Sequence, residues 1–414
     1  MKKFTALALM AAIVLGAFVM AACEDSGDNT ESTQETTESS AASKEESEES
    51  SETISDISMV ESKPEITNEQ LSSINDFIAQ YKDIPDFTVK AKEIDATEIS
   101  KNKKVSLIPD NSNNVFTSLV VKQFKSAAKS AGFKKIYADN SDGTPAAYND
   151  ALAKAVEKSD IVVMYGDINK DPIANEIELT QANGVKVLSA GYVGKDMKDH
   201  YVDYTIPIDY QLAGKLLADW AISKNKGKVN ALAINNSDST LSTSIYNGFA
   251  DEFKKYVTSG YCTVQSGSSI EVENGLATKI KQALEKDPNL NYIIVLDETM
   301  INDAISAVDQ IGKNIKIIAT GGGTSAFTSA ENGKIEMLVA QSYEWTAYAM
   351  VDYALRVIDK SELPDQQSVP VRVVTKDSIK SDLENTEYEG IDGFYEICFG
   401  ANFVTGYRKL WGLD

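Results

Sequence analysis

The stretch Lys104-Val105-Ser106-Leu107-Ile108-Pro109-Asp110-Asn111-Ser112-Asn113-Asn114-Val115-Phe116 decides the fold of this chain. Its first part, Val105 to Pro109, has the apolar composition of a buried strand. After a polar turn, apolar residues recur at helical spacing up to Gly132, which predicts a helix with one buried face formed by Phe116, Val120, Phe124, Ala127 and Ala131. A buried strand that leads directly into an amphipathic helix predicts an α/β fold with a mostly parallel sheet.

The same alternation of strand and helix continues in two blocks. Further strands of the first block are predicted at Lys135–Ala138, Ile161–Met164, Val185–Ser189 and Tyr204–Ile206. The second block opens at Asp209, a helix N-cap, and its strands are predicted at Val229–Ile234, Tyr261–Gln265, Tyr292–Leu296, Ile315–Ala319 and Ile335–Ala340, with helices near 240–257, 271–286, 299–311 and 344–359. Because parallel crossovers are right-handed in about 98% of cases, we expect two doubly wound parallel-sheet lobes. Residues just after the strands are then expected to line a cleft between them.

The N-terminal residues predict export. Lys2 and Lys3 precede an apolar run, Ala6 to Met20, which is short for a membrane span, so residues 1–22 are predicted to be a signal peptide. The run Met20-Ala21-Ala22-Cys23 resembles the lipobox of bacterial lipoproteins, although leucine is usual in place of Met20. This resemblance implies that Cys23 is lipidated and that the protein is anchored on the extracellular face of the cell membrane. An ordinary signal peptide and a retained membrane helix are the alternatives.

Residues 23–65 are predicted to be a disordered acidic tether. Between Glu24 and Ser62 there are thirteen Asp or Glu residues and a single lysine, Lys44, so this segment carries about −12 of the net charge of −22. Low hydrophobicity with high net charge cannot offset the entropy of ordering a chain. An acidic tail that binds a basic partner is the alternative. Residues 66–103 are predicted to be a helical extension that begins with a capping box formed by Thr67 and Gln70.

Composition excludes several classes of function. The chain has one histidine, His200, which argues against histidine-based nucleophile schemes and metal sites. No basic patch with interleaved aromatic residues is present, so we do not expect nucleic-acid binding. No metal or other cofactor is expected either. Gly321-Gly322-Gly323-Thr324-Ser325-Ala326 fits a loose dinucleotide-loop pattern, but the next strand follows too soon for a full crossover helix. The glycines are therefore expected to let the backbone approach a ligand at the cleft, or to make a turn. Cys262 and Cys398 could be paired or free.

The fold-deciding stretch 104–116 is similar to the opening of type I periplasmic sugar-binding proteins, the ribose and galactose receptor family. Later landmarks keep the order of that family across residues 104–375: Ile208-Asp209-Tyr210, Asn247-Gly248-Phe249, Leu296-Asp297-Glu298 and Asn332-Gly333-Lys334-Ile335 leading to Gln341. The resemblance implies a hinge and assigns 104–207 plus 342–362 to lobe 1 and 208–341 plus 363–375 to lobe 2. Residues 376–414 form a C-terminal extension that it does not match.

The resemblance also implies a function, a monomeric solute-binding lipoprotein of an ABC importer. It would close on a small solute, most simply a carbohydrate, and present it to the membrane permease. A bilobal sensor for a membrane kinase or chemoreceptor is an alternative with the same fold. A surface glycosidase is a third possibility, but no pair of carboxylates is singled out by a motif, so the prediction is a binding protein and not an enzyme.

Candidate ligand-binding residues come from two sources. Asn114, Phe116 and Gln341 match the family pattern directly. The sequence departs from the family pattern at three places. Gly191-Tyr192 replaces an Asp-Arg pair, Leu296 replaces an asparagine, and Gly322 replaces an aspartate. Aromatic and acidic residues near strand ends complete the predicted site, which consists of Asn114, Phe116, Asp167, Tyr192, Tyr210, Tyr246, Asp297 and Gln341. Aromatic walls with a few acids suit a glycan or a cationic or heterocyclic solute; the alternative for each residue is lobe packing or helix capping.

Overall fold

The computed structural model describes residues 54–60, 63–112, 115–191, 199–268, 275–365, 368–385 and 398–413. All of them belong to one compact unit, Glu52–Asp414. The predicted signal peptide, Cys23 and the greater part of the predicted tether lie outside these residues.

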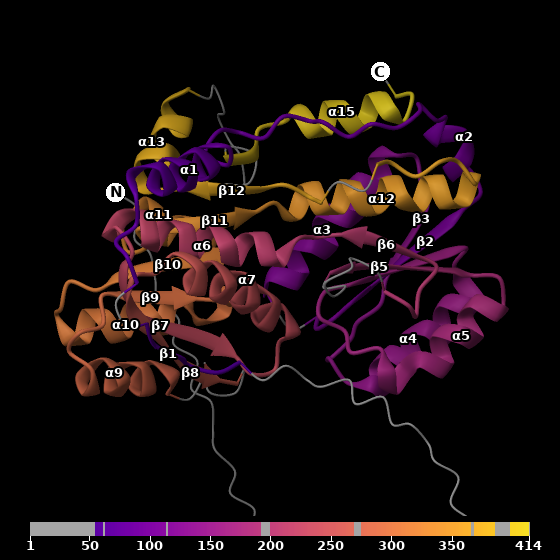
Figure 1. Cartoon of the computed structure of the whole chain (residues 1–414). Helices are drawn as coiled ribbons and strands as arrows, with labels where there is room; N and C mark the ends of the chain where they lie inside the picture. The colour runs from indigo at the N-terminus through magenta and orange to yellow at the C-terminus, as the bar shows by residue number, and fades with distance from the viewer. Residues whose placement is uncertain are drawn as a thin grey trace, which may run out of the picture. The chain divides into compact units, whose positions relative to one another are not determined.

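The first sheet contains five parallel strands in the order β3-β2-β4-β5-β6. Figure 1 shows α4 and α5 on one face of this sheet and α3 and α12 on the other. The strands are β2 (Lys104–Pro109), β3 (Lys135–Ala138), β4 (Ile161–Tyr165), β5 (Lys186–Gly191) and β6 (Tyr204–Pro207). The helices are α3 (Val115–Ser130), α4 (Pro145–Lys158), α5 (Ala174–Ala182) and α12 (Tyr343–Asp359), with a 3-10 turn η1 (Asp171–Ile173) before α5.

The second sheet contains seven strands in the order β1-β8-β7-β9-β10-β11-β12. Its five middle strands are parallel, while β1 and β12 run antiparallel to their neighbours at the two edges. The strands are β1 (Ile57–Val60), β7 (Lys228–Asn236), β8 (Ser259–Gly267), β9 (Tyr292–Val295), β10 (Lys316–Gly321), β11 (Met337–Gln341) and β12 (Val371–Val374). Its helices are α6 (Tyr210–Asn225), α7 (Thr240–Tyr256), α9 (Leu276–Lys286), α10 (Ile301–Ile311) and α11 (Thr324–Glu331), with a 3-10 turn η2 (Glu298–Met300).

This arrangement confirms the predicted fold class of two doubly wound lobes. From β2 onward the chain passes between the two sheets three times: after β6, after β11, and between α12 and β12. The segment between β1 and β2 also joins the two sheets. Two of these passages contact each other, because the backbone N–H of Val369 donates to the carbonyl of Pro207 at 3.3 Å. The predicted N-cap at Asp209 is also confirmed, since its carboxylate accepts from the backbone N–H of Leu212 at 2.9 Å.

Strand β1 corrects the prediction that residues 23–65 are disordered throughout. Ile57 of β1 is opposite Cys262 of β8 and is only 8% exposed. The backbone N–H of Val264 donates to the carboxylate of Asp56 at 2.7 Å, which fixes the strand at this edge. Charge composition averaged over a long window missed this strand, because a run of only four residues, three of them apolar, is too short to change that average.

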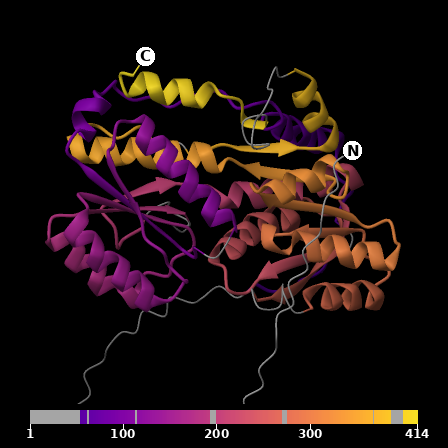
Figure 2. The same ribbon diagram turned by 180° about the vertical axis from the view of Figure 1, so that it is seen from behind.

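The terminal extensions contain α1 (Asn68–Ala79), α2 (Ala96–Ser100), α13 (Lys376–Asn385) and α15 (Asn402–Leu410). The capping box of Thr67 and Gln70 at the start of α1 is confirmed. Residues 84–95 are not helical, so the expectation of a helical extension over 66–103 holds only at its two ends. Pro85 disfavours helix for the residue before it. Figure 2 shows α15, the yellow helix beside the C-terminus, running along α12.

Candidate functional site

A cavity of about 410 Å³ lies at the carboxyl ends of strands from both sheets. Loops that follow β2, β4, β7, β9 and β10 line it, together with the ends of α3, α6 and α12. This is the position that the strand order of open α/β sheets predicts for a ligand site.

The cavity brings together five of the eight predicted ligand-binding residues. Those that line it are Phe116, Asp167, Tyr210, Asp297 and Gln341. Asn114 and Tyr192 lie outside the described residues. Two further aromatic residues, Tyr165 at the end of β4 and Tyr343 at the start of α12, line the cavity as well.

Tyr246 is a correction. Its side chain is 4% exposed, its ring lies 6.2 Å from that of Phe249, and its hydroxyl donates to the carbonyl of Ser55 at 2.6 Å. Successive residues of a helix point about 100° apart, and the neighbouring Ile245 lines the cavity instead. The structure therefore places Tyr246 in the packing between α7 and the segment before β1. Trp345, near the start of α12, is not among the residues that line the cavity, and its ring stacks on Phe403.

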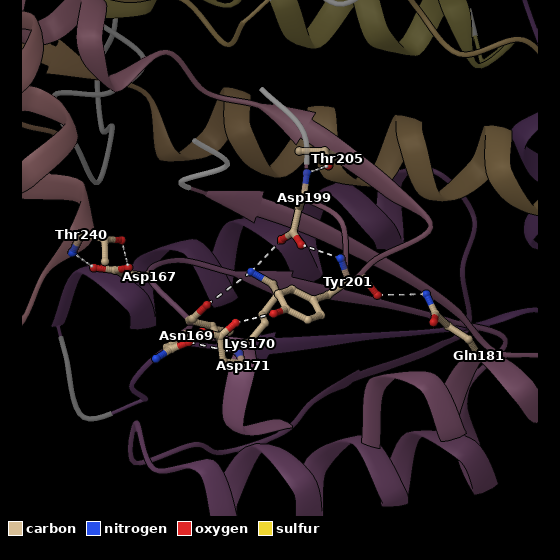
Figure 3. A network of polar contacts seen from close by, with 10 residues as sticks. Asp167, Asn169, Lys170, Asp171, Gln181, Asp199, Tyr201, Thr205 and Thr240 are labelled. Atoms are coloured by element: carbon tan, nitrogen blue, oxygen red, sulfur yellow. Dashed lines mark hydrogen bonds and ion pairs between the residues drawn. The ribbon is translucent and has the colours of Figure 1, made fainter. Parts of the chain in front are cut away.

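Asp167 joins the two lobes at the cavity edge. Gly166, with φ +100°, turns the chain after β4 so that the Asp167 carboxylate faces the first residue of α7 (Figure 3). That carboxylate accepts from the backbone N–H of Thr240 at 2.5 Å, from the Thr240 hydroxyl, and from the N–H of Leu241 at 3.4 Å. A carboxylate is stabilised at a helix N-terminus by unpaired N–H groups and by the helix dipole. Asp167 therefore bonds across the cavity in this conformation.

A buried ion pair supports the loop that carries Asp167. Lys170 Nζ lies 2.8 Å from the Asp199 carboxylate, and both side chains are only 7% exposed. Asp199 in turn accepts from the backbone N–H of Tyr201 at 3.1 Å and donates its own N–H to the Thr205 hydroxyl at 3.2 Å (Figure 3). The loop after β4 is thus connected to the segment that leads into β6.

Glu298 is a cavity residue that the sequence analysis missed. Its Oε2 accepts from the backbone N–H groups of Gly322 at 2.9 Å and Gly323 at 2.8 Å, and its Oε1 accepts from the hydroxyl of Tyr343. Burial raises the pKa of Glu298 to about 7, although these three hydrogen bonds act in the opposite direction. The glycine turn 321–323, noted in the sequence, was the available signal, because backbone N–H groups that become buried require an acceptor.

The other acids of the cavity also accept hydrogen bonds from the protein. Asp297 accepts from Thr299 through one oxygen and from the Asn236 amide at 2.7 Å through the other. Asp110 accepts from the Thr117 hydroxyl at 2.9 Å, and burial raises its pKa. These bonds orient the carboxylates, so a ligand would meet a preformed polar wall.

Phe116 makes the second contact between the lobes. A Cβ atom placed on Gly323 would lie 2.2 Å from Cε1 of Phe116. The ring at the start of α3 therefore lies directly against the glycine turn after β10, and no larger residue fits at position 323. This close approach is to an aromatic ring of the other lobe, whereas the sequence analysis expected the glycines to approach a ligand or to make a turn.

The cavity combines aromatic rings with an excess of negative charge. Six carboxylates line it: Asp110, Asp142, Asp167, Asp238, Asp297 and Glu298. Its described lining includes no Lys, Arg or His. Within the part of the chain that the structure describes, no group of three or more His, Cys, Asp or Glu could hold a metal ion. The arrangement can therefore accept hydrogen bonds from ligand hydroxyl groups and can stack apolar ligand faces on Phe116, Tyr165, Tyr210 and Tyr343.

Residues 105–362 match the periplasmic binding protein domain family. The chain belongs to this family. Its proteins bind solutes and are not enzymes, which confirms the family and the absence of catalysis that the sequence predicted. The ribose import binding protein RbsB of Bacillus subtilis is 22% identical over 290 residues, which cover 67% of this chain and 90% of that protein.

Solved structures share the fold. GanP, a glucose-galactose binding protein from Geobacillus stearothermophilus, superposes with a TM-score of 0.58 at 19% identity, over 66% of this chain and 98% of that one. A carbohydrate transporter from Acidothermus cellulolyticus in complex with myo-inositol also gives 0.58, at 20% identity over 68% and 97% of the two chains.

Among the residues that the structure describes, no helix has the length and apolar character needed to cross a membrane.

Cys262 and Cys398 are both buried free thiols, so the disulfide that the sequence left open is not formed. Burial raises the pKa of each thiol to about 12.

Proposed function

We propose that this protein is an extracellular, lipid-anchored substrate-binding protein that captures a small carbohydrate in the cavity and delivers it to an ABC import permease. The observation that carries the proposal is the cavity itself, which lies at the strand ends of both lobes and combines four aromatic rings with oriented hydrogen-bonding groups. The names of its relatives, a ribose import binding protein and a glucose-galactose binding protein, supply the solute class.

The size and chemistry of the cavity suit such a solute. Ligand pockets measure roughly 300–1,000 Å³, and this cavity measures about 410 Å³. Phe116 and Tyr210 would stack against C–H faces of a sugar ring. Gln341 would bond to sugar hydroxyls through its amide, which both donates and accepts. Asn114 and Tyr192 remain proposed ligand contacts on the grounds of the sequence alone.

Delivery would depend on lobe closure. A ligand shifts a two-state equilibrium only by the difference between its affinities for the two states. Residues of the cavity come from both lobes, so a solute held by Phe116 and by Asp297 contacts both only when the lobes are closed. The closed form would then report occupancy to the permease, and the acidic segment after Cys23 would act as a spacer from the membrane.

Ligand titration tests this function. Full-length protein with Cys23→Ser is screened by thermal shift against neutral pentoses, hexoses and inositols, and against nucleosides, amines and peptides. Each hit is then titrated by calorimetry. We expect saturable binding of a neutral sugar or polyol, with a rise in melting temperature that grows with ligand concentration. Binding of an amine or a peptide but no sugar would contradict the proposed solute class.

Membrane anchoring has its own test. Wild-type protein is expected in the membrane fraction of the producing cell, and Cys23→Ser protein in the medium, because the substitution removes the thiol that would carry the lipid. Retention of the Cys23→Ser protein in the membrane would show that a different segment anchors it.

A further inference from the structure

Two segments outside the family match cross the hinge together. The first, which we call the N-terminal strap, comprises residues 81–96; the second, the C-terminal strap, comprises residues 398–411. Both lie outside residues 105–362, to which the family match is confined. Each strap contacts lobe 2 near one end and lobe 1 near the other.

The N-terminal strap is attached at two points by buried arginines. Arg372 of β12, in lobe 2, donates from Nε to the carbonyl of Lys82 at 2.8 Å. Arg356 of α12, which packs on lobe 1, donates from Nη1 to the carbonyl of Lys92 at 2.9 Å. The two arginines are 3% and 0% exposed, and each is oriented by a carboxylate: Asp382 for Arg372 and Asp352 for Arg356. The strap thus joins one lobe to the other.

The C-terminal strap repeats this arrangement. At its start, the carbonyl of Cys398 accepts from Nη1 of Arg372 at 2.6 Å. Farther along, α15 packs on α12, where the ring of Phe403 stacks on Trp345 at 4.6 Å. At its end, Trp411 stacks on Tyr348 and donates from Nε1 to the Asp352 carboxylate at 2.9 Å. Arg372 and Asp352 therefore serve both straps.

The two straps also bind each other. The backbone N–H of Ile94 donates to the carbonyl of Leu410 at 2.8 Å, and that of Ala96 to Trp411 at 3.0 Å. At the middle of the N-terminal strap, the ring of Phe87 packs edge-on against Tyr407 at 4.9 Å. Figure 1 shows the N-terminal strap running from α1 to α2 beside α15. The straps therefore form one unit, which we call the brace.

The brace also contacts the hinge itself. The backbone N–H of Asp365, in the passage from α12 to β12, donates to the carbonyl of Lys90 at 3.3 Å. Phe87 also lies 6.2 Å from Trp345, at the start of the helix that follows the second passage. Any rotation of one lobe about these passages must move Arg372 relative to Arg356.

We propose that the brace limits the opening of the two lobes and holds the ligand-free protein close to the arrangement seen here. Nine residues separate Lys82 from Lys92, and an extended chain spans at most about 3.6 Å per residue, so the reach of the strap between its attachment points is limited. Opening must break the hydrogen bond at one attachment point or separate the aromatic layer of Phe87 and Tyr407. Hydrogen bonds from charged donors are among the stronger ones in proteins, so breaking one disfavours the open form.

The brace affects binding as well as motion. When a ligand binds only the closed conformation, its apparent affinity equals its intrinsic affinity multiplied by the fraction of protein that is closed. A brace that keeps the lobes near closure reduces this loss. At the front of the cavity, the bond between Asp167 and Thr240 acts in the same direction.

The test measures lobe separation without any ligand, so its outcome does not depend on the proposed function. In full-length protein with Cys23→Ser, nitroxide labels are attached at Lys154→Cys on α4 and Lys286→Cys on α9, both exposed positions. The native thiols Cys262 and Cys398 are buried. Distances between the labels are then measured by double electron–electron resonance.

Two variants loosen the brace. One inserts about six Gly and Ser residues after Asp86, between the two attachment points; flexible loops tolerate such lengthening at small cost in free energy. A matched insertion after Gly312, in the loop between α10 and β10 of lobe 2, serves as control, since nothing lies within 4 Å of a Cβ placed there. The second variant, Phe87→Ala, removes the ring in the middle of the strap and covers the case in which the insertion does not fold.

We expect a single short distance between the two labels in the protein with the unaltered brace and in the control insertion variant. The strap insertion and Phe87→Ala are expected to add a population at longer distance while circular dichroism stays native. Identical distance distributions in all folded proteins would overturn the proposal. A wide distribution in the protein with the unaltered brace would overturn it as well.

Discussion

At the scale of single residues, Glu298 is the most informative side chain of the cavity. Its pKa is raised from 4.5 to about 7 because it is buried, while its hydrogen bonds hold the glycine turn and Tyr343. An acid of this kind stabilises the fold most when it is protonated. As the pH rises above about 4.5, the carboxyl group loses its proton first in the unfolded chain, which stabilises the unfolded state. The contribution of Glu298 is complete below that pH and is lost as the pH rises to about 7.

The substitution Glu298→Gln tests this sign. The amide keeps the shape and can accept from the glycine turn, but it does not titrate. A shift from 4.5 to about 7 corresponds to a free energy on the order of 3 kcal/mol. Between about pH 4.5 and pH 7.5, we expect the unfolding free energy of wild type to fall by up to that amount more than that of the variant, measured by urea unfolding. Glu157→Gln, at an exposed position of α4, should follow wild type; equal pH dependence in all three proteins would contradict the raised pKa.

Gln341 carries a residue-scale prediction about the ligand. It ends β11, lines the cavity and donates from Nε2 to the Thr320 hydroxyl at 3.3 Å. Gln341→Ala removes one donor and one acceptor from the wall and is expected to weaken ligand binding by about 1–3 kcal/mol, measured by calorimetry with the sugar found in the screen. Gln310→Ala, on the exposed side of α10, is the control. Unchanged affinity in Gln341→Ala would remove this residue from the site.

At the scale of elements, local patterns account for the central strands and helices. Strand β3 has the predicted bounds, and β2 and β6 differ from prediction by one residue, because an apolar run between turn residues is a local signal. Strand β1 was missed because its pairing partner β8 lies about 200 residues away. The contacts of the N-terminal strap are more distant still, since Lys82 and Lys92 bind arginines 290 and 264 residues away. Long-range pairs of this kind leave no periodic pattern for sequence analysis to detect.

Strand β1 gives a prediction with an internal control. Ile57 is 8% exposed, and Met59, two residues along the strand, is 58% exposed. Ile57→Asp exchanges a buried apolar side chain for a charge and is expected to lower the unfolding free energy by at least about 1.5–3 kcal/mol. Met59→Asp should change it by less than about 0.5 kcal/mol. Chemical unfolding of both variants measures the difference, and equal effects would mean that β1 is not part of the folded body.

At the scale of the whole molecule, the sequence located the cavity better than it located the contacts within it. The rule that ligands sit beyond the strand ends correctly brought Asp167 and Asp297 to one cavity. The same rule failed for Tyr246, because a helix places only some of its residues toward the cavity. Glu298 escaped notice because its partners, Gly322 and Gly323, come 24 and 25 residues later. Which side chains meet is decided by tertiary packing, and one sequence carries little information about it.

The net charge of the chain and of the cavity lining predicts which sugars bind weakly. The chain carries a net charge of −22, and the described lining of the cavity holds six carboxylates and no cationic side chain. An anionic sugar would enter a region of negative potential without a partner for its charge, and burying an unpaired charge is costly. A neutral sugar only exchanges hydrogen bonds with water for hydrogen bonds with the oriented acids.

Paired ligands test this expectation. Galactose is compared with galacturonate, and ribose with ribose 5-phosphate, by competition against the neutral sugar that binds best. We expect the charged member of each pair to bind at least about tenfold more weakly, a difference of about 1.4 kcal/mol. Because salt shortens the range of electrostatic interactions to about 3 Å at 1 M, the difference should shrink as the salt concentration rises. Binding of the anionic member as tightly as the neutral one would show that the cavity supplies a cation and would contradict the charge distribution described above.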